Sequence, residues 1–344
     1  MKLQSSHVHI DLDSTVLVHS IVPFVQNDEV ILACNDKKIY HCNLLSKKIS
    51  SQPITLNSCP LTLAWQPLSL SQRLADSVLA VGCSDGSVEF FQAHTNGQEE
   101  WPLRSIRKIK AHDGSVTSIC WSHDDSSLAT SGVDGEVKIW SRVGHLRIKL
   151  ASFDTAVNAL SWGPRCESIV IAQGRNLSLT QVHGRGESIC WGWNSGIILA
   201  LDWNIMTDTI VSGDEDGVFR ISTSEGVCLY SSKPHNHPIT TLSWFPNGEY
   251  FAIGSFGNVQ LCDTSGNIHD QLQCSVASSV LQMNRSQDTS QLIGGCSSGE
   301  IVVLNLVGLK KFWGEVSVEL LTTNSLKVTY PMSFEDSHMI DIAR

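Results

Sequence analysis

The stretch AHDGSVTSICWSHDDSSLATSGVDGEVKIWS, residues 111–141, contains the pattern that decides the fold. One apolar run ends at Trp121, a second follows it, and Asp134-Gly135 separates this second run from EVKIW. Asp-Gly between such runs is a strong hairpin signal, because glycine readily takes the positive φ of a tight turn. The stretch therefore predicts a unit of three or four short antiparallel strands.

The same pattern recurs along the chain. Tryptophan ends an equivalent apolar run at separations of 56, 41, 41 and 41 residues, and steps of similar length reach an apolar residue on either side. The resulting seven anchors are Phe24, Trp65, Trp121, Trp162, Trp203, Trp244 and Met283. Short turns such as Ser84-Asp85-Gly86 and Glu215-Asp216-Gly217 follow the anchors and confirm the register.

A period of about 40–45 residues with up to four strands per unit is typical of a β-propeller blade. We therefore predict an all-β fold, a single seven-bladed WD40-type β-propeller at residues 1–328. Its N-terminal strand is expected to close the last blade, because an open ring would leave unpaired sheet edges. Residues 329–344 are interpreted as a C-terminal tail, the start of a truncated second propeller.

Composition excludes several classes of protein. The chain has 344 residues, of which 42% are hydrophobic and 17% charged, so it can bury a large core. The net charge of −10 argues against a protein that coats nucleic acid, and no apolar run is long enough for a membrane helix. The 11 cysteines form no CxxC pair and are expected to be reduced thiols. We expect no nucleic acid partner, no membrane insertion, no metal and no cofactor.

Residues 111–141 resemble the WD repeat. In the proteins that share this motif, residues at the positions of His112, Thr130, Asp134 and Trp140 hydrogen-bond to one another within the blade. The chemistry is suitable, because the indole and imidazole supply donors while the hydroxyl and carboxylate supply acceptors. Other units keep only fragments: His235 matches His112, whereas Asn194 stands in its place in the fifth unit.

A longer stretch narrows the resemblance to one family. PHNHPITTLSWFPNGEYFAIGSFGNVQLCDTSG, residues 234–266, together with LSWGP, GIILALDWN and SGDEDG, is similar to the first propeller of the intraflagellar transport protein 80 family. This resemblance implies a non-catalytic scaffold subunit of intraflagellar transport complex B, which supports cilium assembly and anterograde transport. It implies a location at the cilium, ciliary base, cytoplasm and cytoskeleton. Its implied partners are other complex B subunits, with tubulin or cargo as further candidates.

Two alternatives remain open from the sequence. One is a scaffold of another trafficking assembly, of complex A or vesicle-coat type. The other is a propeller enzyme, which would need carboxylates or histidines clustered around the central channel. The motif Gly82-Cys83-Ser84-Asp85-Gly86 matches G-x-S-x-G, but it lacks the helix that a nucleophile elbow requires. The pair His235 and His237 has too few neighbouring ligands for a zinc site.

The densest basic run is PLRSIRKIKAH, which contains Arg104, Arg107, Lys108 and Lys110. The simpler interpretation is a solvated outer strand, since charge runs are usually exposed faces. The alternative is a docking patch for an acidic partner. Strand alternation places Arg107 and Lys108 on opposite faces, so the four residues need not form one patch.

Overall fold

The computed structural model describes the chain in part. The backbone is described outside residues 1, 10–15, 25–28, 50–51, 67–76, 94–102, 184–187, 193, 246–247, 274–277, 285–290, 297–299, 308–309, 314–315, 323–324, 330–337 and 342–344. Side chains are described within residues 16–273, apart from Phe24 and the gaps just given, and at Ile301. Among these residues, no helix has the length and hydropathy needed to cross a membrane.

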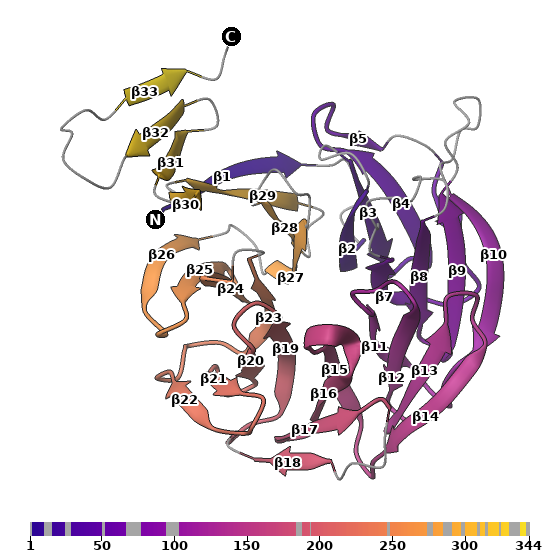
Figure 1. Ribbon diagram of the computed structural model, residues 1–344. Coiled ribbons are helices and arrows are strands. Elements are labelled where there is room, and N and C mark those ends of the chain that lie inside the picture. The colour runs from indigo at the N-terminus through magenta and orange to yellow at the C-terminus, as the bar shows by residue number, and fades with distance from the viewer. Residues whose placement is uncertain are drawn as a thin grey trace.

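Antiparallel sheets of short strands are arranged around a common centre (Figure 1). In the six sheets of consecutive strands around this centre, the first strand is innermost and the following strands lie progressively farther out. The first three blades contain β2 (Val18–Phe24), β3 (Glu29–Cys34), β4 (Lys38–Asn43), β5 (Lys48–Ile49) and β6 (Ile54–Thr55); β7 (Pro60–Trp65), β8 (Val78–Cys83), β9 (Ser87–Ala93) and β10 (Leu103–Lys110); and β11 (Val116–Trp121), β12 (Ser127–Gly132), β13 (Glu136–Ser141) and β14 (Leu146–Ser152).

The next three blades repeat the four-stranded plan. A single 3-10 turn, Pro164–Cys166, links the two inner strands of the fourth blade. These blades contain β15 (Val157–Trp162), β16 (Ser168–Gln173), β17 (Asn176–Gln181) and β18 (Ile189–Trp191); β19 (Ile198–Asn204), β20 (Thr209–Asp214), β21 (Phe219–Thr223) and β22 (Cys228–Ser231); and β23 (Ile239–Trp244), β24 (Tyr250–Ser255), β25 (Asn258–Asp263) and β26 (Ile268–Gln273).

The sheet between the sixth and first blades has a different construction. It combines β27 (Ser278–Asn284), β28 (Gln291–Cys296) and β29 (Glu300–Val307) with the N-terminal strand β1 (Lys2–His9), which pairs antiparallel with β29. Its inner strand β27 packs beside β23 on one side and β2 on the other. This composite sheet closes the ring by joining two distant parts of the chain.

The all-β propeller architecture agrees with the sequence analysis, but the expected count of seven blades is wrong. If a blade is a sheet of consecutive strands, the structure is a six-bladed propeller closed by the composite sheet. The physical reason is that the chain after the sixth blade supplies only three strands before it leaves the ring. The next strands, β30 (Lys310–Trp313), β31 (Val316–Thr322), β32 (Ser325–Thr329) and β33 (His338–Asp341), form a separate sheet.

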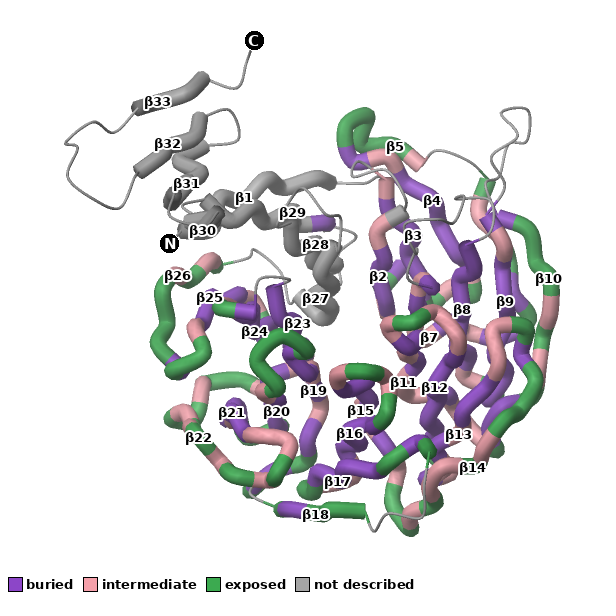
Figure 2. Tube along the Cα trace, viewed as in Figure 1, coloured by how far each residue is buried: buried purple, intermediate pink, exposed green. Residues whose placement is uncertain are grey.

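Burial is greatest in the middle strands of the blades and least in the outermost strands (Figure 2). All six residues of β12 are buried, whereas most of β10 is exposed. Hydrophobic clusters form between neighbouring blades: Phe90 of the second blade packs with Trp121 and Trp140 of the third. Burying one such aromatic side chain stabilises the fold by about 1.5–3 kcal/mol. Partner-accessible side chains therefore lie on the outer strands and on the turns.

The Asp-Gly turns of the second and third blades contact the loops that lead to the next blade. Gly86 has a φ of +80°, and a Cβ there would lie 2.1 Å from the carbonyl oxygen of His112. Gly135 repeats this arrangement against Phe153 with a φ of +75°. The backbone N–H groups of His112 and Phe153 in turn donate to the carbonyls of these glycines, at 3.0 Å in both cases. Only glycine allows the turn and the following loop to approach this closely.

Candidate functional site

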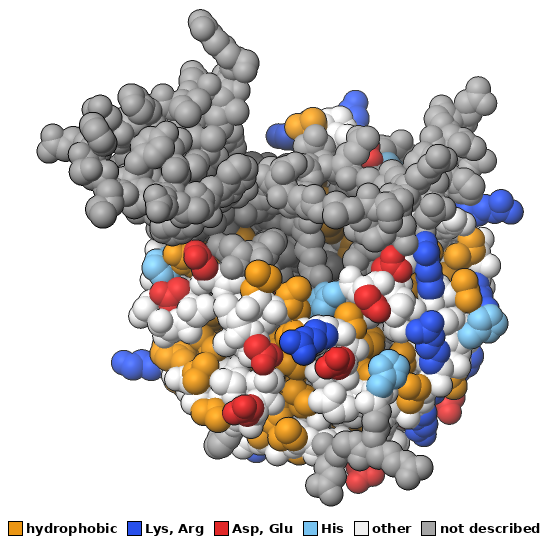
Figure 3. Space-filling view, in the orientation of Figure 1, with side chains coloured by type: hydrophobic (Ala, Val, Ile, Leu, Met, Phe, Trp, Pro, Cys, Tyr) orange, Lys and Arg blue, Asp and Glu red, His pale blue; other side chains and the backbone are white. Residues whose placement is uncertain are grey.

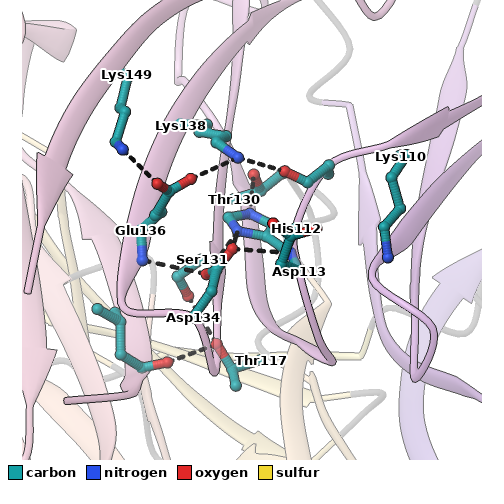
Figure 4. A network of polar contacts seen from close by, with 12 residues as sticks. Lys110, His112, Asp113, Thr117, Thr130, Ser131, Asp134, Glu136, Lys138 and Lys149 are labelled. Atoms are coloured by element: carbon teal, nitrogen blue, oxygen red, sulfur yellow. Dashed lines mark hydrogen bonds and ion pairs between the residues drawn. The ribbon is translucent and has the colours of Figure 1, made fainter. Parts of the chain in front are cut away.

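The structure brings His112, Thr130 and Asp134 together in the third blade (Figure 4), and Trp140 joins them through Thr130. Trp140 Nε1 donates to Thr130 Oγ1 at 2.9 Å, and Thr130 Oγ1 lies 2.8 Å from His112 Nε2. His112 Nδ1 lies 3.0 Å from Asp134 Oδ1. A consistent assignment has Thr130 donating to Nε2 and His112 donating from Nδ1, so every proton in the chain of bonds has one acceptor.

Burial and hydrogen bonding set the charges in this network. Desolvation lowers the pKa of His112, which keeps the imidazole neutral. Burial alone would raise the pKa of Asp134, but the N–H groups of Asp113 and Glu136, together with His112, hold it below its usual value. Those two N–H groups donate to the Asp134 carboxylate at 2.9 and 3.1 Å. The carboxylate therefore fixes both the tight turn and the loop that enters the blade.

The fifth blade contains a different buried polar cluster, which the sequence analysis missed. Arg220 Nη1 donates to Asp214 Oδ2 at 2.8 Å and to Asn194 Oδ1 at 2.6 Å. The Asp214 side chain is fully buried, and its Oδ1 accepts the N–H of Val218 at 2.9 Å. The sequence offers two signals for this cluster. Asn194 stands where the third blade has a histidine, and Arg220 follows the turn residue Gly217 by three positions. An ion pair therefore replaces the imidazole network in this blade.

Two anchor tryptophans link neighbouring blades through their indole groups. Trp121 Nε1 donates to the carbonyl of Ala64 at 3.0 Å, and Trp162 Nε1 donates to the carbonyl of Cys120 at 3.1 Å. In both bonds the acceptor is the residue that precedes the anchor of the previous blade. These bonds satisfy polar groups at the inner edge, where neighbouring blades share no strand pairing.

The indole of Trp203 bonds to a carboxylate instead, whereas the indole N–H of Trp244 has no hydrogen-bond partner among the described residues. Trp203 Nε1 donates to Asp208 in its own blade at 2.9 Å. Asp202, which precedes this anchor, accepts the backbone N–H of Trp203 at 2.9 Å and that of Trp244 in the next blade at 2.8 Å. Asp202 is an acidic residue on an inner strand, and these bonds give it a structural role in joining the fifth and sixth blades.

The remaining anchors differ in how far they are described. Trp65 ends β7 and packs, partly buried, against the cluster between the first and second blades. Phe24 ends β2 and Met283 lies in β27, but the side chains of both are outside the described residues. The structure therefore gives no side-chain contacts for the first and last of the seven anchors.

The four residues of the basic run separate into two pairs on opposite faces of β10. Arg107 lies opposite Phe90 in the register and Arg104 opposite Gln92, so both face the third blade. Arg107 Nη1 donates to the carbonyl of Val143 at 2.8 Å, in the turn between β13 and β14. The first pair therefore lies beside the outer edge of the third blade.

Lys108 and Lys110 face the other way and interact within their own blade. Lys108 Nζ pairs with Glu89 at 2.7 Å, a bond that raises the pKa of the lysine. Lys110 Nζ donates to the carbonyl of Asp85 at 2.6 Å. The charge of Lys108 is largely compensated, so the run does not act as a single patch.

The other motifs have structural explanations. Ser84 lies in the turn between two strands, and its hydroxyl accepts the N–H of Cys59 at 3.2 Å. The His235 ring is half-buried beside Phe219, and His237 contacts Phe256, with ring centroids 6.0 and 6.1 Å apart. In the part of the chain with described side chains, no group of three or more His, Cys, Asp or Glu could hold a metal ion.

Comparison with known proteins places this arrangement in a family. The WD domain, G-beta repeat family matches residues 103–141 and 226–259, in the third and sixth units. The intraflagellar transport protein 80 homologues of Mus musculus and Rattus norvegicus are each 33% identical over 313 residues, 90% of this chain. The chain is a WD-repeat homologue of intraflagellar transport protein 80.

This homology covers only part of the relatives. The chain spans 39% of the length of the mouse and rat proteins. More distant similarity extends to the F-box-like/WD repeat-containing protein TBL1X of Mus musculus, which is 26% identical over 54% of this chain and 35% of its own length.

Proposed function

We propose that this homologue of intraflagellar transport protein 80 is a non-catalytic scaffold subunit of intraflagellar transport complex B. In that role it supports cilium assembly and anterograde transport, and it acts by binding other complex B subunits at the cilium and its base. The observation that carries the proposal is the 33% identity over 90% of the chain.

The described geometry supports binding rather than catalysis. The polar clusters of the third and fifth blades are buried and internally hydrogen-bonded, with His112 in one and Asp214 in the other. The acidic residue on an inner strand, Asp202, accepts backbone N–H groups of two blades. A rigid frame of this kind presents its exposed outer strands and turns to partners.

Affinity purification of the tagged full chain from ciliated cells tests the proposal. Complex B subunits should co-purify, and restoring the chain to cells that lack it should restore cilium length. Recovery of vesicle-coat or complex A subunits instead would identify a different trafficking assembly. Cilia of normal length after deletion would contradict the role in assembly.

Two variants distinguish a loss of partner binding from a loss of folding. Arg220→Leu removes the partner of buried Asp214 and should reduce both folding and co-purification. Lys48→Glu changes an exposed outer-strand residue of the first blade and should leave the fold intact. Co-purification that survives unfolding of the ring would show that the captured proteins bind the chain non-specifically.

A further inference from the structure

The outer edges of the second and third blades form one exposed surface that carries arginine and apolar side chains. Figure 3 shows Lys and Arg side chains, with His and hydrophobic side chains between them, along the side where β10 and β14 run in Figure 1. We call this the rim surface. Its residues are Arg104, Ile106, Arg107, Val143, His145 and Leu146.

Arg107 makes the rim surface continuous across the two blades. Besides its bond to the Val143 carbonyl, its Nη1 lies 3.4 Å from His145 Nε2. Its side chain also crosses the turn closely, because a Cβ on Gly144 would lie 3.4 Å from Arg107 Cδ and 3.0 Å from the Phe90 ring. The two outer strands are thus held together by side-chain packing as well as by the hydrogen bond.

The positive charge of the rim surface is not compensated within the described residues. The nearby acidic groups are occupied by lysines: Glu89 pairs with Lys108, and Glu136 pairs with Lys138 and Lys149. Neither Arg104 nor Arg107 forms an ion pair with a carboxylate in the described part of the chain, and Arg107 bonds to a neutral carbonyl instead. This local excess contrasts with a net charge of −10 for the whole chain.

The apolar side chains of the rim surface are unusually accessible. Ile106 is 45% exposed, Val143 56% and Leu146 54%, and all three lie among the arginines. Guanidinium groups bind carboxylates through paired hydrogen bonds, and arginine is enriched at protein interfaces. Exposed aliphatic side chains favour a protein partner, because recognition of a phosphate backbone relies on charge and hydrogen bonds and needs no apolar contact.

We propose that the rim surface binds an acidic segment of a partner protein, in which apolar side chains are spaced among glutamate or aspartate residues. The carboxylates would pair with Arg104 and Arg107, and the apolar side chains would cover Val143 and Leu146. This inference deepens the proposed scaffold function, because it states the chemistry of one partner. Its test uses a synthetic probe, so its failure is distinguishable from failure of the ciliary role.

The probe is a fluorescent peptide of repeated Glu-Glu-Leu units, titrated with the full chain and followed by anisotropy. The double variant Arg104→Glu/Arg107→Glu should weaken binding about tenfold, since each reversal removes an attraction and adds a repulsion. Leu146→Ser should weaken it about fivefold through lost apolar contact. The matched control Lys48→Glu/Lys110→Glu makes the same charge change at exposed positions outside the rim surface, on β5 and on the opposite face of β10, and should alter binding less than about twofold.

Four results would overturn the proposal. The first is absence of peptide binding to the unmodified chain. The second is an equal loss of binding in the matched control, which would show that only net charge matters. The third is tighter binding of single-stranded DNA or of phosphatidylserine vesicles than of the peptide, with the same loss on arginine reversal. A peptide with Gln in place of Glu should not bind, and binding by that peptide would also contradict the proposal.

Discussion

Replacing Thr130 by valine tests whether the polar network of the third blade stabilises the ring. The Thr130 side chain is fully buried, and valine keeps its shape while removing the hydroxyl. In the wild-type chain this hydroxyl accepts from Trp140 Nε1 at 2.9 Å and contacts His112 Nε2 at 2.8 Å. The variant therefore leaves a buried indole N–H and a buried imidazole nitrogen without partners.

The magnitude follows from those two unsatisfied groups. Each buried polar atom left without a partner costs about 1–3 kcal/mol, so Thr130→Val should lower the free energy of unfolding by about 3 kcal/mol. Thr130→Ser keeps the hydroxyl and loses one methyl group, so its cost should be close to 1 kcal/mol, about that of a buried methylene. The double variant Thr130→Val/Trp140→Phe should cost less than the sum of its single variants, because the indole donor is also gone.

Urea unfolding followed by tryptophan fluorescence and by circular dichroism measures these differences as shifts of the midpoint at constant slope. Agreement of the two probes is needed before a free energy is assigned. If Thr130→Val is no less stable than Thr130→Ser, the network does not stabilise the blade. If the double variant shows additive costs, the bond between Thr130 and Trp140 has no measurable strength.

Three further predictions concern charge. Because the folded-state pKa of His112 lies below the unfolded value of about 6.5, the free energy of unfolding should decline as pH falls below about 6.5, by at most about 1.4 kcal/mol per pH unit. His112→Gln should remove this part of the decline when the urea midpoints of both proteins are compared over the same pH range. A difference in midpoint between the two proteins that does not change with pH would contradict the prediction. The lowered pKa of Asp134 should add a second loss of stability below about pH 4, absent from Asp134→Asn in thermal unfolding. Arg220→Leu should lower the free energy of unfolding by about 3–5 kcal/mol, because it leaves the Asp214 carboxylate buried and unpaired. The double variant Asp214→Val/Arg220→Leu should regain most of this stability. Equal unfolding midpoints for the single and double variants would refute the role of the pair.

The repeat in the sequence was sufficient to predict the propeller, because hairpin turns and apolar runs act over a few residues. The anchors Trp121 and Trp162 lie at equivalent inner-strand positions. The blade count rested on Phe24 and Met283, where the pattern has no tryptophan. A periodicity locates a unit but does not say how many of its strands come from elsewhere in the chain. That information depends on long-range pairing, here between β1 and β29.

The candidate site shows the same division between local and long-range information. The positions of His112, Thr130, Asp134 and Trp140 were predictable because a known motif fixes their spacing. The cluster of Asn194, Asp214 and Arg220 was not, since each of these residue types is ordinarily exposed in a turn or outer strand. Their proximity depends on how the loop before β19 approaches β21.

Neighbouring blades share no strand ladder, so the contacts between inner strands decide how rigid the ring is. The indole of Trp162 and the carboxylate of Asp202 supply such contacts with different chemistry, one at an anchor and the other at the residue before an anchor. The outer strands β10 and β14 are more exposed, and only some of their side chains pack between blades. Arg107 adds a bond at the outer edge, since it joins β10 to the turn before β14 while remaining beside exposed apolar side chains. A side chain that both orders the rim and keeps a cationic face accessible is suited to recognition, and this is why we place the acidic partner at the rim surface.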